Sequence, residues 1–147
     1  MLKPTRQLLA VAIALLVFGL LGAPATGRAA APDTPLKVLV FWGSWCSNCP
    51  AVMREMEVLR KQYIGRNVEF VAVSLEGETA PQQYLSSKGY GFALKTNGDA
   101  LLARYQAVGV PWVVLTDNTG KAVANPSRGG AADDLAGLVK LELDLRT

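Results

Sequence analysis

The chain has 147 residues, enough for one domain with its own core, and half of them are hydrophobic, which excludes a disordered chain. Its 15 Lys and Arg residues outnumber its 12 Asp and Glu residues, and it has no histidine. Three of the basic residues, Lys3, Arg6 and Arg28, lie near the N-terminus, so residues 32–147 carry 12 basic and 12 acidic groups. This neutral balance gives no indication of a nucleic-acid partner.

The first 31 residues have the composition of an export signal. After the basic start, the uncharged apolar run Leu8–Leu21 is followed by small residues. This order is typical of a secretory signal peptide, with cleavage after Ala31 or after Ala25. The apolar run is shorter than the ~20 residues of a membrane span, although an uncleaved N-terminal membrane anchor is an alternative. We therefore expect a leader over 1–31, a folded domain over 32–147 and a periplasmic location.

The first predicted elements form a βαβ unit. Leu36–Trp42 is a continuous apolar run with β-rich composition, which is typical of a strand buried on both faces. Helical spacing follows over about Ser47–Tyr63, and Gly65 ends it. Val68–Leu75 is a second buried strand. Such a unit is parallel, with a right-handed crossover.

The rest of the domain is predicted to be two helical stretches, a β-hairpin and a last helix. Helical patterns cover Thr79–Lys88 and about Asp99–Gln106. Strands follow over Pro111–Thr116 and Lys121–Ala124, and the polar turn between them indicates a hairpin. Ala131–Leu145 is the last predicted helix. The order of elements indicates an α/β fold.

The two cysteines of the chain, Cys46 and Cys49, are separated by two residues. A disulfide that closes so short a loop stabilises a fold weakly, whereas the spacing suits redox exchange. Cys46 follows a buried strand and stands at a helix start, where the helix dipole stabilises a thiolate and lowers the thiol pKa. Pro50 is compatible with the first turn of that helix. We expect Cys46 to be the exposed nucleophile and Cys49 the buried resolving thiol.

Other uses of two cysteines are less well supported. A structural zinc site needs four ligands, and two Cys without His cannot supply them, so no metal and no other cofactor is expected. A two-coordinate copper(I) site of a copper-delivery module and an inert disulfide that stabilises an interaction domain are the alternatives.

The motif around the cysteines indicates a family. Phe41–Cys49 (FWGSWCSNC) resembles the F-W-x-x-W-C-x-x-C signature of thioredoxin-like proteins, most of all the exported TlpA/ResA type. Val108–Pro111 (VGVP) resembles the cis-proline loop of that family. The resemblance implies a thioredoxin fold with a mixed four-stranded sheet in the order 2-1-3-4. It also implies a cis bond between Val110 and Pro111.

The resemblance also implies roles for individual residues around the cysteines. Trp45 would be an exposed apolar contact beside the disulfide, and Val110 and Pro111 would receive the substrate as an added strand. Trp112 stands where the family has a small polar residue, so it either shapes substrate choice or packs in the core. Val40 occupies the place of a buried aspartate that assists proton transfer in thioredoxin.

A glutamate after the second strand would handle the proton instead. Glu78 matches the family's Gly-Glu motif best, and Glu76 is the alternate; both could also be ordinary solvated loop carboxylates.

The function that this resemblance implies is thiol–disulfide exchange in the periplasm. Ser47 and Asn48 carry no charge, so stabilisation of the thiolate is modest, which favours a reductant over an oxidant. The substrates would be disulfides of exported proteins, as in cytochrome c maturation. The electron donor would be a membrane thiol carrier.

Overall fold

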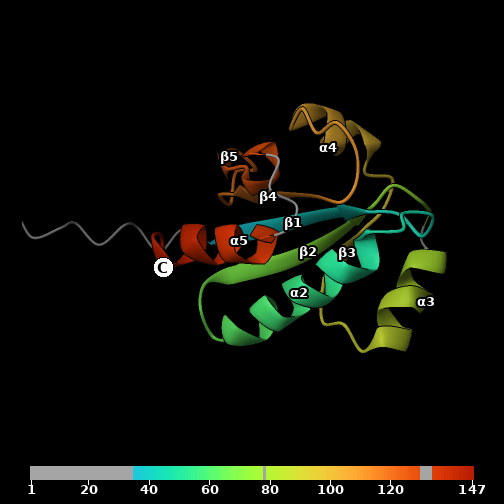
Figure 1. The fold of residues 1–147 in the computed structure, drawn as a ribbon, viewed down its shortest axis with the longest axis horizontal. Coiled ribbons are helices and arrows are strands. Elements are labelled where there is room, and N and C mark those ends of the chain that lie inside the picture. Colours follow the sequence, from blue (N-terminus) through green and yellow to red (C-terminus); the bar gives the residue numbers. More distant parts are fainter. Residues whose placement is uncertain (1–34, 78, 130–133) are drawn as a thin grey trace, which may run out of the picture. The chain divides into compact units, whose positions relative to one another are not determined.

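The strand β1 (Leu36–Trp42) is the centre of a five-stranded sheet with the order β3-β2-β1-β4-β5 (Figure 1). The structure is a computed structural model, and it describes residues 35–77, 79–129 and 134–147. β1 pairs in parallel with β2 (Val68–Ser74) and antiparallel with β4 (Trp112–Thr116). Most residues of these three strands are buried, as expected for continuous apolar runs that are covered on both faces.

Two short strands form the edges of the sheet. β5 (Ala122–Ala124) pairs antiparallel with β4, and β3 (Ala93–Lys95) pairs in parallel with β2. The four strands predicted from the sequence have the predicted order, whereas β3 is a fifth strand that was not predicted. Its three residues are too few to show an alternating pattern, and two of them are exposed.

Within the described residues, four α-helices and one 3₁₀ turn surround the sheet. Their bounds are α2 (Cys49–Gln62), α3 (Thr79–Lys88), α4 (Asp99–Arg104), η1 (Pro126–Gly129) and α5 (Leu135–Asp144). α3 has its predicted bounds, while α2 and α4 are shorter than predicted. For the last helix, positions 131–133 lie outside the described residues, and Asp134 caps α5 by accepting a hydrogen bond from the Gly137 N–H. No helix in the described part of the chain is long and apolar enough to cross a membrane.

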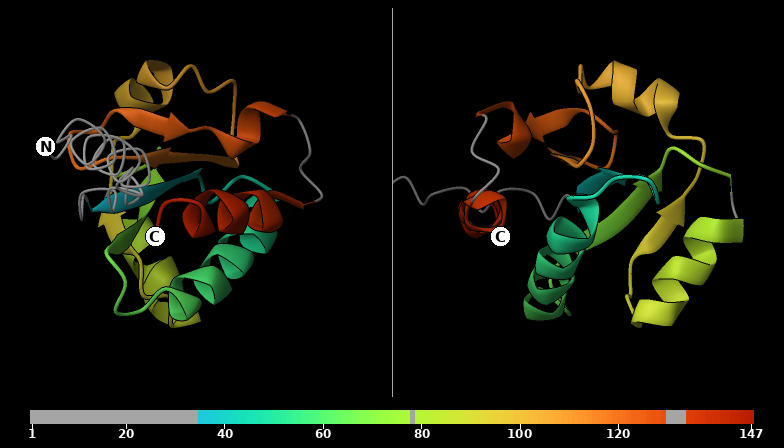
Figure 2. Two further views of the ribbon diagram at one scale, coloured as in Figure 1. Left: turned by 90° about the vertical axis from the view of Figure 1, so that its left-hand side faces the viewer. Right: turned by 45° about the vertical axis from the view of Figure 1, so that its right-hand side comes forward.

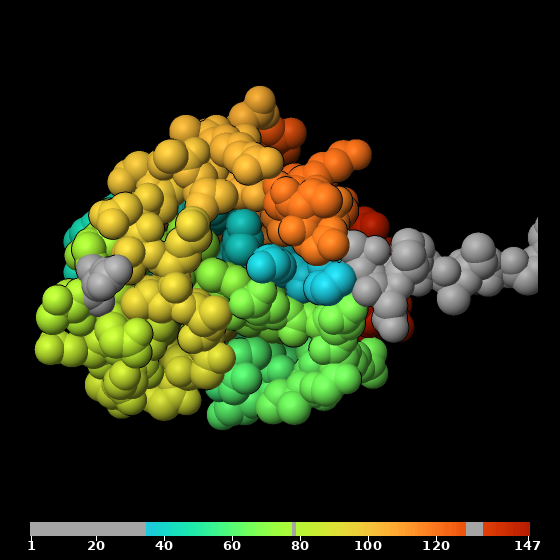
Figure 3. Space-filling model, turned by 180° about the vertical axis from the view of Figure 1, so that it is seen from behind, coloured from blue at the N-terminus to red at the C-terminus, as the bar shows by residue number. Residues whose placement is uncertain are grey.

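The helices cover both faces of the sheet (Figure 2). Val38, Val40 and Trp42 of β1 face the larger core, to which α2, α3 and α5 contribute buried side chains. Leu39 and Phe41 face the smaller core, which α4 covers. From behind, β1 is visible only as a small cyan area between its neighbours (Figure 3). Each fully buried aliphatic or aromatic side chain contributes about 1.5–3 kcal/mol, so the central strand is firmly fixed.

Glu57 of α2 is a buried carboxylate, only 4% exposed. It accepts hydrogen bonds from the guanidinium of Arg60, at 2.8 and 2.9 Å, and from the backbone N–H of Gly91, at 3.1 Å. Burial raises the pKa of Glu57, but these hydrogen bonds and the positive charges of Arg60 and Lys61 outweigh it and lower the pKa below its ordinary value. Glu57 therefore ties α2 to the connection between α3 and β3.

We expect Glu57→Gln to lower the free energy of unfolding at pH 7 by about 1–3 kcal/mol, because Arg60 loses its charged partner. A carboxyl whose pKa is lowered by folding stabilises the protein above its unfolded pKa, and this contribution is lost as the pH falls. The difference between wild type and variant should therefore shrink below about pH 4. Urea unfolding across this pH range measures it, with the exposed Glu55→Gln on the same helix as control. A difference that grows on acidification would contradict the assignment.

Candidate active site

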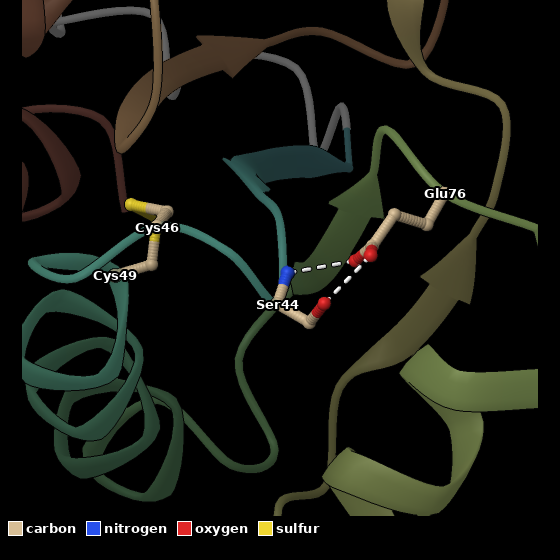
Figure 4. The surroundings of a disulfide bond; sticks show 4 residues. All are labelled: Ser44, Cys46, Cys49 and Glu76. Carbon is tan, nitrogen blue, oxygen red and sulfur yellow. Dashed lines mark hydrogen bonds between the residues drawn. A yellow bond between two sulfur atoms is a disulfide. The ribbon is translucent and has the colours of Figure 1, made fainter.

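Cys46 and Cys49 lie at the junction of β1 and α2 and are joined by a disulfide (Figure 4). After β1 ends at Trp42, the chain makes a turn in which the Cys46 N–H donates to the Gly43 carbonyl at 3.1 Å. A second turn follows, in which the Cys49 N–H donates to the Cys46 carbonyl at 3.3 Å. These turns explain why α2 begins at Cys49, two residues later than the predicted start.

The two cysteines differ in exposure, although less than expected. Cys46 is 8% exposed and Cys49 is 1% exposed, and both contact the larger core. Cys46 is thus the more accessible of the two, as predicted. The expectation that it is an exposed residue is wrong for the disulfide form, in which it is a buried member of the larger core.

The N-terminus of α2, which follows Cys46 in the chain, is open in the sense that no side chain caps it. Asn48 is the N-cap residue, but its side chain makes no capping hydrogen bond, and the first turn contains no acidic residue. Pro50 brings no N–H of its own. The remaining N–H groups and the positive end of the helix dipole can therefore act on a thiolate in the reduced protein.

Trp45 is 66% exposed beside the disulfide, as predicted. Its indole lies against the backbone of Gly43, because a Cβ added there would be 2.8 Å from the indole Nε1. Gly43 thus leaves room for the ring, and the residue before Cys46 presents an apolar surface to solvent.

The bond between Val110 and Pro111 is cis, which confirms the prediction. Both residues are half-buried, and Val110 packs against the core cluster that contains the two cysteines. Trp112 is only 8% exposed and packs with Phe41 and Tyr105 in the smaller core. Of its two interpretations, core packing is the one that these contacts support.

Of the two glutamates considered for proton transfer, Glu78 and Glu76, the structure describes only Glu76. Glu78 lies outside the described residues. Glu76 is half-buried, and its carboxylate accepts hydrogen bonds from the backbone N–H of Ser44 at 2.7 Å and from its hydroxyl at 2.6 Å. Figure 4 shows the carboxylate pointing toward Ser44, to which both of its hydrogen bonds run.

Comparison with known proteins shows the family to which the chain belongs. The model of a family described as thioredoxin-like matches residues 36–122, more than half of the chain. The chain belongs to the thioredoxin-like family.

The chain is also similar in sequence to proteins that are named as thiol-disulfide oxidoreductases. The thiol-disulfide oxidoreductase ResA of Bacillus anthracis is 28% identical over 104 residues, which cover 69% of this chain and 60% of that protein. ResA of Bacillus subtilis strain 168 is 31% identical over 87 residues, covering 58% of this chain and 49% of that protein. This chain therefore spans between about half and three fifths of the length of these relatives.

The fold is also found among solved structures. A thiol-disulfide oxidoreductase from Bacteroides fragilis superposes with a TM-score of 0.58 at 22% identity, covering 73% of this chain and 79% of that one. At this identity the likeness concerns the fold alone, and it agrees with the thioredoxin fold predicted from the sequence.

Ser44 is a site residue that the sequence reasoning missed. The signal was available in the βαβ unit, because Trp42 and Ser74 are partners in the parallel ladder. Ser44 and Glu76 each stand two residues past those partners. Once the register is known, a donor and an acceptor can be placed together at the same edge of the sheet.

We expect alkylation of the reduced protein to modify Cys46 before Cys49. Cys46 is the more accessible of the two and adjoins the open helix N-terminus, while Cys49 is almost completely covered. Peptide mapping after treatment with limiting iodoacetamide measures the order, and Cys46→Ser and Cys49→Ser provide reference rates for single thiols. Preferential modification of Cys49 would reverse the assignment.

Proposed function

We propose that this protein is a thiol–disulfide oxidoreductase that exchanges protein disulfides through Cys46 and Cys49. The observation that carries the proposal is the disulfide between these residues at the open N-terminus of α2. The arrangement combines a sulfur that is the less buried of the two, a thiolate-stabilising helix end and a second sulfur already within bonding reach. The similarity to the ResA proteins, which are named thiol-disulfide oxidoreductases, supports the same activity.

The reaction proceeds in two exchange steps. In the reduced protein, the Cys46 thiolate attacks one sulfur of a substrate disulfide, and the other substrate sulfur leaves as a thiolate and takes up a proton. Cys49 loses its proton and attacks Cys46 in the mixed disulfide, which releases the second substrate thiol. The substrate gains two electrons, and the protein ends with the Cys46–Cys49 disulfide. A dithiol donor then reduces this disulfide by the reverse exchange.

We propose a reducing role toward exported proteins in the periplasm, with a membrane thiol carrier as the donor. Ser47 and Asn48 are uncharged, so the thiolate, and with it the reduced form, gains little extra stability. The signal-like composition of residues 1–31 supports export. Apocytochrome c is the substrate class that the TlpA/ResA resemblance suggests.

The substrate surface of this proposal is apolar. Trp45 offers an exposed ring, Val110 packs against the larger core that contains both cysteines, and Val110 and Pro111 are both half-buried. An extended substrate segment would bind along this loop by main-chain hydrogen bonds. Trp112 would support the loop that contains Val110 and Pro111 from the core side and would not contact the substrate directly.

We expect Cys46→Ser to abolish disulfide exchange, because no thiolate remains to attack. Cys49→Ser should attack but not resolve, so it should accumulate mixed disulfides that dithiothreitol releases. Insulin reduction measures the first effect. Non-reducing electrophoresis with mass spectrometry of partners trapped in cells measures the second. Unchanged insulin reduction by Cys46→Ser would disprove the proposed function.

The reaction also needs a group that exchanges a proton with the Cys49 thiol. Cys49 is almost fully covered, and Val40 of the adjacent strand is apolar and buried. We propose Glu78 for this role, because it follows β2, whose C-terminal end lies beside that of β1. Its position in the Gly77–Glu78 pair supports this assignment by family resemblance.

Glu78→Gln is therefore expected to lower the exchange rate and to shift the rate–pH profile, since an amide cannot exchange the proton. Stopped-flow kinetics from pH 5 to pH 9 measures both, and Glu69→Gln at the opposite end of β2 is the matched control. A profile identical to wild type would mean that water carries the proton.

A further inference from the structure

Glu76 has both of its carboxylate oxygens engaged by one residue of the active-site loop. Oε2 accepts from the Ser44 backbone N–H and Oε1 from the Ser44 hydroxyl, at 2.7 and 2.6 Å. Hydrogen bonds to an ionised carboxylate are shorter and stronger than those between neutral groups. The pair therefore joins the loop before Cys46 to the loop after β2, thirty-two positions away in sequence.

Glu76 is itself held in place by its own backbone. Its N–H donates to the hydroxyl of the buried Ser74 at 3.0 Å, and its carbonyl accepts from the Asn97 N–H at 3.3 Å. Ser74 is fixed in turn by the Gly98 N–H, which donates to its carbonyl at 2.9 Å. Gly98 approaches so closely that a Cβ on it would lie 2.5 Å from Val73 Cγ1. The Glu76 carboxylate thus extends from a segment of backbone that hydrogen bonds and close packing hold in place.

The donor side of the pair belongs to the loop that carries the exposed site residues. Ser44 lies between Gly43 and Trp45, whose indole rests on the Gly43 backbone. The Gly43 carbonyl accepts the hydrogen bond that starts the turn at Cys46. In the oxidised protein the disulfide also holds Cys46, but this covalent restraint is lost on reduction.

We propose that Glu76 is a positioning residue, which holds Ser44 and thereby keeps Trp45 and the Cys46 sulfur oriented for attack in the reduced protein. This inference rests on the proposed exchange activity. It assigns Glu76 a role different from the proton transfer proposed for Glu78. Displacement of a nucleophile by about 1 Å can cost a large part of a reaction rate, so the effect should appear in exchange kinetics.

Two substitutions separate positioning from charge. Glu76→Gln removes the charge but keeps both links, because its carbonyl oxygen accepts from the Ser44 N–H and its amide N–H donates to the Ser44 hydroxyl. Glu76→Ala removes the charge and both links. If Glu76 positions the loop, Glu76→Ala should lower the rate of insulin reduction about tenfold, whereas Glu76→Gln should stay within about twofold of wild type.

The matched control is Glu69→Ala. Glu69 is a carboxylate on β2 that forms an ion pair with Lys37 of β1 at 2.9 Å, at the opposite end of the two strands from Glu76. Its removal should leave the exchange rate unchanged. All rates are measured below the unfolding temperature of every variant, as determined by circular dichroism.

A double-mutant cycle with Ser44→Ala tests the route of the effect. Ser44→Ala should slow exchange about threefold in the wild-type background and have little effect in Glu76→Ala, because the partner hydroxyl is then already without its acceptor. Additive effects would overturn the proposal. So would a loss in Glu76→Gln equal to that in Glu76→Ala, or a rate of Glu76→Ala equal to that of Glu69→Ala.

The outcome is independent of the test of the proposed function. If Cys46→Ser retains exchange, the activity itself is misassigned. If Cys46→Ser is inactive while Glu76→Ala remains as fast as wild type, only the positioning role is rejected.

Discussion

The parallel pairing of β1 with β2 is the constraint on which the site depends. Its register places Trp42 opposite Ser74, and the Leu75 N–H continues the ladder by donating to the Trp42 carbonyl at 3.1 Å. Both strands therefore end at one edge of the sheet, and the loops that leave them start side by side. The turn to Cys46 and the Ser44–Glu76 pair are built on this common edge.

Much of the fold could be predicted because its central strands have strong patterns. β1, β2 and β4 are long apolar runs that need cover on both faces, so composition alone identifies them. β3 is different, because it exists through pairing with β2 rather than through a pattern of its own. The start of α2 also escaped prediction, since the turn from Cys46 to Cys49 uses backbone hydrogen bonds that have no sequence signal.

The site was predictable where a local motif defines it and not where packing decides. The cysteine spacing and the Gly-Val-Pro segment identify two of its parts directly. The position of Trp112 depends on the space beside Phe41 and Tyr105, which only the assembled smaller core defines. Likewise, the residue chemistry of Ser44 and Glu76 is ordinary for loops, and their pairing needs the register of two strands.

Two features near Cys46 bear on the direction of exchange. The uncapped start of α2 favours a thiolate, whereas the residues between the cysteines add no positive charge. A weakly stabilised thiolate makes the dithiol form less stable relative to the disulfide, and such a pair gives up its electrons more readily. The uncharged residues between the cysteines therefore support the proposed reducing direction, while the proposed role of the Ser44–Glu76 pair is to hold the nucleophile in place.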